Sequence, residues 1–259
     1  MSLALCAIAR DEEAFLAGLL ESVHGVVDEV VIGIDSRTTD RTHELAEQHG
    51  ARTFWFDWRD SFALARNLVI ERARSDWLLT LDCDEVLLPA GREVLSSLRL
   101  DDVPLQVDGF LMLMQETDLL DHELGPPERS STRLFRNTPD LRYVGRIHEE
   151  VRYVPDPPRT WCGMFEGGPH IRHYGVDPTV WRVRDKARRD RRLLHLRLRD
   201  NPDDAVAYCY LALMADREGR HRAARTFARR ALNCGPRTLH DDRVAQMQQL
   251  AGTGRMFHA

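Results

Sequence analysis

The 259-residue sequence has almost no lysine, no paired cysteine motif and no long apolar run. Without a run of about 18 apolar residues, no membrane-spanning helix is expected. The five cysteines are scattered and no CxxC pair occurs, so neither a zinc knuckle nor a disulfide framework is indicated. A reducing, cytoplasmic setting is therefore expected. Charges follow the apolar N-terminal run at once, which favours a first strand over a signal peptide.

Several signatures of catalysis and binding are also absent. No GxGxxG follows the first apolar run and no GxxxxGK[ST] occurs, so dinucleotide sites and P-loop sites lack support. The sequence contains no GxSxG turn of a serine hydrolase and no HExxH pair of a zinc peptidase. No aromatic platform accompanies the basic segment 181–199, so a solvated helix explains it better than nucleic-acid binding does.

Charge is distributed unevenly along the chain. Residues 1–176 contain 18 basic and 31 acidic residues, a net charge of −13, and residues 177–259 contain 18 basic and 10 acidic residues, a net charge of +8. Such a split indicates two parts with different roles, and we predict domains at 1–176 and 177–259. Lys186 is the only lysine. This arginine bias is typical of a GC-rich genome, with binding of an anionic ligand as the alternative explanation.

The first third of the chain alternates between strand and helix patterns. Strands are predicted at 3–9, 29–35, 51–58 and 76–87, and helices at 11–23, 39–50 and 61–74. Helices of this length between strands imply βαβ units and a mostly parallel sheet. Further on, the sequence predicts a helix at 91–100, a loop at 117–131, and β-like segments at 109–116, 131–137, 141–154 and 169–175.

The remainder of the chain is predicted to be helical. A basic helix is expected at 181–200, a helical pair turning at Gly219 within 201–236, and a further helix at 240–250. The pair resembles one tetratricopeptide repeat in the spacing of its small and large residues. The matching positions are Leu211, Ala212, Gly219, Ala224, Ala231 and Pro236. An ordinary helical hairpin is the alternative, and either structure favours a packing or acceptor-binding role.

Two carboxylates, Asp82 and Asp84, follow the apolar strand segment WLLTL. In an open α/β sheet, ligands bind beyond the carboxyl ends of the strands. Carboxylates at i and i+2 repel each other, and a divalent cation such as Mg²⁺ or Mn²⁺, bound together with a diphosphate, offsets that repulsion. The pattern therefore favours a metal–diphosphate site, with a solvated turn as the alternative.

The set of motifs resembles family 2 glycosyltransferases of the GT-A fold, in the subgroup with a tetratricopeptide-like tail. The likeness extends over about residues 3–240 and is carried by AIARDEEAFLAGLLESV, by EVVIGIDSRTTDRT, by FALARNLVIERARSDWLLTLDCDEVL, and by RLFRN, YVGRIHEEV and IRHYG. It implies an α/β GT-A domain with a Rossmann-like mixed sheet, followed by an α-helical region. It also implies metal-dependent, inverting transfer of a sugar from a nucleoside-diphosphate sugar, most commonly a UDP-sugar, to an acceptor hydroxyl.

The resemblance assigns roles to individual residues. The nucleoside would be cradled by Ala9, Arg10, Glu12 and Asp35, with Arg66 near the nucleotide and Asp82 at the ribose or metal. Asp84 would be the direct metal ligand, and His173 a further metal ligand or a diphosphate donor. Arg37 departs from the family pattern, which usually has glycine at that position.

Each assignment has an alternative. Asp35 is a possible helix cap, although Asp40 suits that cap better. Arg66 could serve only to pair with Asp82 or Asp35. His173 could be structural, and His170 competes for its role.

Two later arginines are less clearly assigned. Arg133 and Arg136 are expected to share a strand face. On that face they would bind donor phosphate, hold Asp84 or form surface ion pairs.

Glu149 is the predicted catalytic base. Inverting transfer needs one carboxylate that takes the proton from the acceptor hydroxyl. The sequence Ile147-His148-Glu149 matches the family's Val/Ile-His-Glu motif. Strand alternation places Glu149 on one face and His148 and Glu150 on the other, which makes Glu150 the rival.

The acceptor is left open by the sequence, since a glycan, a lipid and a protein side chain all fit the motifs. A non-catalytic adaptor is the alternative function. In that reading the GT-A part is a scaffold, and residues 177–259 bind a protein partner through the tetratricopeptide-like helices.

Overall fold

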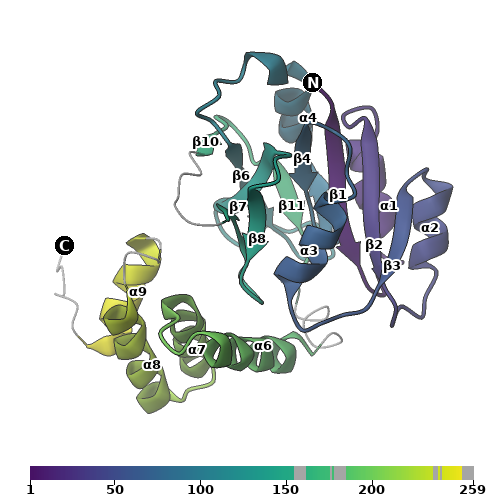
Figure 1. The fold of residues 1–259 in the computed structure, drawn as a ribbon. Coiled ribbons are helices and arrows are strands. Elements are labelled where there is room, and N and C mark those ends of the chain that lie inside the picture. Colours follow the sequence, from purple (N-terminus) through teal and green to yellow (C-terminus); the bar gives the residue numbers. More distant parts are fainter. Residues whose placement is uncertain (155–161, 176, 178–184, 236–238, 240, 253–259) are drawn as a thin grey trace. The chain divides into compact units, whose positions relative to one another are not determined.

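The computed structural model describes residues 1–154, 162–175, 177, 185–235, 239 and 241–252, with the side chains of 129–131 left aside. The chain divides into two compact units (Figure 1). Unit 1 comprises Met1–Val144 and Glu149–Arg184, and unit 2 comprises Gly145–His148 and Asp185–Ala259. The predicted domain boundary at Val176, the start of the predicted helix 181–200 and Pro236 lie outside the described residues.

Unit 1 is built from strands and helices that alternate in its first half. Its strands are β1 (Leu3–Ala9), β2 (Glu29–Asp35), β3 (Arg52–Phe56), β4 (Trp77–Thr80), β5 (Glu85–Leu87), β6 (Gly109–Glu116), β7 (Glu128–Arg136), β8 (Leu141–Val144), β9 (Glu150–Tyr153), β10 (Cys162–Met164) and β11 (Ile171–His173). Its helices are α1 (Leu16–Val23), α2 (Thr42–Gln48), α3 (Phe62–Ile70) and α4 (Pro89–Ser97), with a short 3-10 turn at Leu100–Asp102.

Among the described residues, nine strands of unit 1 form one mixed sheet, in the order β3-β2-β1-β4-β7-β6-β11-β5 with β10 beside β6. The strands β3, β2, β1 and β4 run parallel to one another. Antiparallel pairing begins where β7 joins β4 and β6. The β4–β7 pair is therefore the place where the sheet changes from parallel to antiparallel pairing. The predicted α/β class with a mixed sheet is confirmed.

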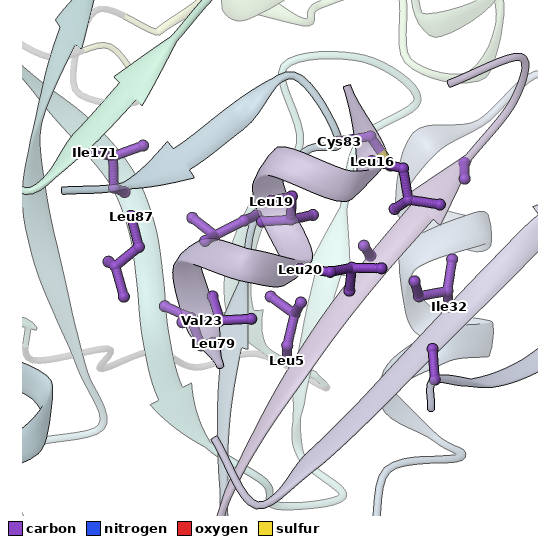
Figure 2. Packing of buried hydrophobic residues seen from close by; sticks show 14 of the residues in the cluster. Leu5, Leu16, Leu19, Leu20, Val23, Ile32, Leu79, Cys83, Leu87 and Ile171 are labelled. Carbon is purple, nitrogen blue, oxygen red and sulfur yellow. The ribbon is translucent and has the colours of Figure 1, made fainter. Parts of the chain in front are cut away.

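Two apolar layers cover opposite faces of this sheet. Neighbouring residues in a strand point to opposite faces, and Leu5 accordingly belongs to one cluster and Cys6 to the other. On the first face, α1 packs its leucines onto β1, β2 and β4 (Figure 2). On the second face, α3 and the small β8–β9 sheet provide the cover, through residues such as Val69 and Tyr143. Each fully buried leucine contributes about 1.5–3 kcal/mol to this packing.

Several predicted elements of unit 1 differ from those observed. The predicted β-like segment 141–154 is divided into β8 and β9, and the last residues of the predicted loop 117–131 belong to β7. The predicted helix 11–23 begins only at Leu16. The residues before it are held by tertiary bonds, since the backbone N–H of Glu12 donates to Thr42 Oγ1 and that of Glu13 to Asp40. The predicted strand 76–87 is split into β4 and β5, and β5 pairs antiparallel with β11.

Unit 2 is helical. It contains α6 (Lys186–Asp200), α7 (Ala205–Arg217), α8 (His221–Cys234) and α9 (Asp241–Ala251). Asp204 caps α7 by accepting a bond of 2.9 Å from the backbone N–H of Ala207. Small residues let α7 and α8 approach closely, because Ala212, Ala228 and Ala231 are fully buried between the helices.

Unit 2 also takes in the short segment Gly145–His148. Arg197 of α6 donates to the carbonyl oxygens of Ile147 and His148, at 2.6 and 3.3 Å. The His148 ring stacks on Tyr210 with 3.3 Å between ring centroids. The described helices of both units are too short or too polar to span a bilayer.

Candidate active site

The carboxyl ends of three parallel strands gather polar residues at one edge of the sheet. β1 ends at Ala9, β2 ends at Asp35, and Asp82 follows β4. The strand register pairs Ala9 with Ile34 and Cys6 with Thr80, so these ends lie close to one another. An edge of this kind is where open α/β sheets bind their ligands.

Asp35 is buried beneath Arg37. Its carboxylate accepts hydrogen bonds from the backbone N–H and Nε of Arg37, at 3.0 and 2.9 Å. Burial alone would raise the pKa of Asp35, but these bonds and the charges of Arg37 and Arg10 outweigh it, so the pKa is lowered. Arg37 also lies 5.7 Å above the ring of Trp58. The residue that departs from the family pattern thus faces the predicted nucleoside contact.

The other three predicted nucleoside residues lie on the same edge. Ala9 is buried at the end of β1. Arg10 is exposed, with its Nε 3.5 Å from Asp11. The backbone carbonyl of Glu12 accepts bonds from Phe15 and Leu16 at the start of α1.

Arg66 joins Asp82 and Glu149 in the centre of the site. Its Nε donates to Glu149 at 2.6 Å and one Nη to Asp82 at 2.5 Å, across 83 and 16 residues of sequence. Burial alone would lower the pKa of Arg66, but the two carboxylates hold it well above the usual value. Burial would likewise raise the pKa of Asp82, and Arg66 holds it well below the usual range. Both groups are therefore charged at neutral pH.

The remaining Nη1 of Arg66 is buried and has no hydrogen-bond partner among the described residues. An unsatisfied donor of this kind costs free energy unless a ligand or water accepts it. Tyr143 lies beneath the guanidinium, with 5.5 Å between Cζ and the ring centre, and its hydroxyl bonds Thr80 at 2.7 Å. The donor is therefore held in place beside two carboxylates.

A second buried pair, Arg133 with Glu85, lies next to the first. The other carboxylate oxygen of Glu85 accepts the backbone N–H of Asp82 at 2.8 Å, which fixes the turn that follows β4. Burial raises the pKa of Glu85 to about 7, and repulsion from Asp82 adds to this, although Arg133 opposes it. No role is predicted for Glu85 from the sequence, although its place directly after Asp82 and Asp84 was a signal that it belongs to the same site.

The predicted metal ligands Asp84 and His173 face each other. Their nearest atoms, Oδ1 of Asp84 and Nε2 of His173, are 3.7 Å apart. His173 Nδ1 bonds the carboxylate of Glu116 at 2.8 Å, a partner that sequence analysis missed. Burial alone would lower the pKa of His173, but Glu116, Glu85 and Asp84 raise it to about 9. A proton therefore occupies this imidazole at neutral pH when no cation is bound.

Gly175 makes this arrangement possible. A Cβ on Gly175 would lie 2.3 Å from His173 Nε2 and 2.7 Å from Asp84 Oδ2. Any side chain there would fill the space between the two groups.

Among the described residues, no three His, Cys, Asp or Glu side chains are grouped to hold a metal ion. Two protein ligands nevertheless fit a cation that takes its other oxygens from water and a diphosphate. At a ligand distance of about 2.1 Å, two ligands of one ion lie at most about 4.2 Å apart, and Asp84 and His173 satisfy that limit. Glu116 orients the imidazole in the way that outer carboxylates orient metal-binding histidines.

The rival residues are held elsewhere. Glu150 pairs with Arg152, whereas Glu149 is largely buried against Arg66. His170 is fully buried, and its Nδ1 accepts the backbone N–H of Leu113 at 3.0 Å, which is a structural role. Asp40 accepts a bond from the backbone N–H of Thr42 at the start of α2, but the N-cap position itself is Arg41, which makes no side-chain cap bond.

Arg136 corrects one prediction. Arg133 and Arg136 do not share a face, because they are three positions apart and strand side chains alternate. Arg136 stacks over Trp77, with 4.6 Å to the ring centre, and donates to the carbonyl oxygen of Val107. It takes no part in the site, whereas Arg133 does through Glu85.

Residues 5–96 match the family model described as Glycosyl transferase family 2. The matched segment contains Asp35, Arg66, Asp82 and Asp84, and ends before Glu149 and His173. A TPR repeat-containing protein of Synechococcus elongatus is 35% identical over 237 residues, which cover 89% of this chain and 56% of that protein. The SPbeta prophage-derived glycosyltransferase SunS of Bacillus subtilis is 22% identical over 200 residues, covering 76% and 45%. The chain thus spans about half the length of these relatives.

Among solved structures, S. aureus TarS aligns with a TM-score of 0.51 and 12% identity, over 98% of this chain and 53% of that one. A TarS fragment in complex with UDP-GlcNAc aligns with a TM-score of 0.50 and 13% identity, over 97% and 80%. At such low identity the likeness concerns the fold. Together the comparisons show that this chain is similar to glycosyltransferases, and they support the predicted GT-A-like α/β architecture.

Proposed function

We propose that this chain is a metal-dependent, inverting glycosyltransferase that moves a sugar from a UDP-sugar to an acceptor hydroxyl. The observation that carries the proposal is the convergence of Asp84, His173 and Glu149 on the carboxyl edge of the parallel strands, where Arg66 bonds both Asp82 and Glu149. The UDP-GlcNAc complex of the similar fold makes uridine the first nucleotide to test.

The donor is proposed to bind along the ends of β1, β2 and β4. Asp35 would accept a nucleoside N–H or a ribose hydroxyl with the lone pairs that Arg37 leaves, while Ala9, Arg10 and Glu12 line the same edge. Asp82 would accept a further ribose hydroxyl. The buried Nη1 of Arg66 is a donor that still lacks an acceptor, so the nucleotide would satisfy it.

Asp84 and His173 would hold the Mg²⁺ or Mn²⁺, which supplies positive charge for the leaving diphosphate when bound. Glu149 would take the proton of the acceptor hydroxyl as that oxygen attacks C1 from the face opposite the diphosphate. Its bond from Arg66 supports this role, because that bond fixes the position of the carboxylate beside Asp82, which the same guanidinium holds.

A thermal-shift titration with UDP and GDP, each with and without Mn²⁺, tests the donor site. A ligand at about 100 times its dissociation constant stabilises the fold by about 2.7 kcal/mol. We expect Mn²⁺-dependent stabilisation by UDP in the wild type and none in Asp84→Ala. Full retention of activity by Asp84→Ala toward every donor would contradict the proposal.

For unit 2 we propose a tetratricopeptide-like helical pair formed by α7 and α8. The support is the row of buried alanines between them and the name of the Synechococcus relative. The separate helical unit also keeps the adaptor as a second candidate function. Binding of a protein partner together with failure to bind any nucleotide would favour it. A cytoplasmic location belongs to the same proposal, since all five cysteines are free thiols.

A further inference from the structure

An eight-residue hairpin, Thr117–Leu124, connects the end of β6 toward β7, and we refer to it as the leucine hairpin. Thr117 and Glu123 form an isolated antiparallel bridge at its base. The side chain of Asp118 accepts the backbone N–H groups of Leu120 and His122, at 2.8 and 2.9 Å, across the turn. Because these bonds fix the turn, the hairpin has a defined shape.

The leucine hairpin exposes three apolar side chains. Leu119, Leu120 and Leu124 are 48%, 76% and 48% exposed. Exposed apolar patches that are rimmed by polar residues mark interaction sites, whereas single exposed apolar residues need no explanation. The adjoining strand β6 buries Met112 completely, so exposure begins where the sheet ends.

The leucine hairpin lies directly beside the proposed catalytic centre. The backbone N–H of Thr117 donates to the carbonyl of His173 at 3.0 Å. Asp121 accepts bonds from Arg172 and from the hydroxyl of Tyr174, at 2.9 and 2.7 Å. Since these two residues flank His173 in the chain, the hairpin is anchored on both sides of it. A ligand that covers the leucines would therefore lie next to the donor.

Charge narrows the choice of ligand. Residues 117–128 contain Asp118, Asp121, Glu123 and Glu128 and no lysine or arginine. Arg172 pairs with Asp121, which still leaves more acidic than basic side chains here. Such a surface repels phosphate-bearing glycans and lipid headgroups and attracts cations. Apolar side chains on the ligand are still needed to cover the leucines.

We propose that the leucine hairpin binds the acceptor, and that the acceptor is a peptide segment in which apolar side chains alternate with lysine or arginine. The inference rests on the proposed function for the identity of the neighbouring site. The peptide would present a side-chain hydroxyl to Glu149 while its apolar residues cover Leu119 and Leu120.

Fluorescence anisotropy with two labelled peptides tests this proposal on the full chain. One peptide is composed of Leu, Lys and Ser, and the other of Leu, Glu and Ser. We expect the wild type to bind the basic peptide at least about tenfold more tightly. The double substitution Leu119→Ser/Leu120→Ser should weaken that binding by about tenfold or more.

Matched controls separate this surface from general effects. Leu105→Ser removes another leucine of unit 1, which is 83% exposed, and should leave binding unchanged. Glu123→Gln should weaken the basic peptide about two- to threefold, whereas Glu93→Gln on α4 should not. Equal binding of the two peptides, or preferential binding to phosphatidylglycerol vesicles, would overturn the proposal.

The failure of the two proposals can be told apart by nucleotide binding. Stabilisation by UDP and Mn²⁺ should be the same in the wild type and in Leu119→Ser/Leu120→Ser. If UDP binds and the basic peptide does not, the acceptor proposal fails alone. If the basic peptide binds through the leucines and no nucleotide does, the glycosyltransferase proposal fails alone. Loss of UDP binding in the leucine variant would show that the hairpin supports the donor and would overturn the acceptor assignment.

Discussion

The two units of the protein differ in what they bury. Unit 1 buries titratable groups in pairs, such as Arg66 with Glu149 and Arg133 with Glu85. In the described part of unit 2, every fully buried side chain is apolar, and alanines fill the space between α7 and α8. Buried ion pairs are poor sources of stability, because removal from water costs nearly as much as the pairing returns. The contrast indicates that unit 1 is selected for chemistry and unit 2 for packing.

The largest effect should come from Glu149→Gln. Removing a general base typically lowers the rate by about 10²–10⁴-fold. Turnover, measured as UDP release in the presence of acceptor, should fall in that range, while the affinity for UDP stays within about twofold. The neighbouring Glu150→Gln is the control, because Glu150 pairs with Arg152 and not with Arg66 in the described part of the chain, and it should keep near-normal turnover. A greater loss in Glu150→Gln would reverse the assignment.

Next in size is the loss of stability on breaking the buried pairs. Arg66→Met leaves Asp82 and Glu149 without their cation and should cost about 3–5 kcal/mol of unfolding free energy. Arg133→Met should cost less below pH 7, since the pKa of Glu85 is already about 7 and this carboxyl can take up a proton. Urea unfolding at pH 6 and pH 8 measures both variants. Equal losses at the two pH values in Arg133→Met would contradict the assignment of that proton to Glu85.

In unit 2 the corresponding loss of stability is expected when a larger side chain is placed in the contact between α7 and α8. Ala228 is fully buried in α8, and Ala228→Leu should overfill the α7–α8 contact at a cost of about 1–3 kcal/mol. Hydrogen exchange of the amides in α7 and α8 should accelerate, with UDP binding unchanged. The control is Arg225→Leu at an exposed position of α8, which should lower the unfolding free energy by no more than about 0.5 kcal/mol. A loss of UDP binding in Ala228→Leu would contradict the separate roles that we assign to the two units.

The smallest expected effect is a loss of unfolding free energy at acidic pH. Burial and the charges of Arg197, Arg243 and Arg189 lower the pKa of His148 to about 3. A lowered pKa stabilises the fold above the unfolded value of about 6.5, and the contribution is lost as the pH falls below it. Between pH 8 and pH 5.5 the wild type should lose about 1.4 kcal/mol more than His148→Phe, which keeps a ring against Tyr210. Parallel pH profiles of unfolding free energy in the two proteins would contradict this.

The parallel half of unit 1 could be predicted because its signals are local. Each of β1, β2 and β4 is an apolar run, and parallel strands bring their carboxyl ends together. Ala9, Asp35 and Asp82 therefore reach one edge of the sheet for reasons visible in short stretches of sequence.

The rest depends on pairing between distant segments. β5 has three residues and is a strand only because β11, over eighty residues later, pairs with it. Arg66 bonds Glu149, which lies 83 residues later in the sequence, and Glu116 bonds His173, which lies 57 residues later. No local period encodes such contacts, because they arise from strand register and from the geometry of loops. For this reason the sequence patterns identified Glu149 and His173 as candidate site residues, but did not predict that they bond Arg66 and Glu116.

The path of the chain through unit 2 limits how the protein could have been assembled. Four residues of that unit, Gly145–His148, are encoded about forty codons before the rest of it, and Arg197 takes up their carbonyl groups. A fragment that ends before α6 would keep this segment and lose the guanidinium that holds it. The helical unit is thus not a cassette that could be appended or exchanged at one gene junction, and exchange between relatives would have to include both stretches together.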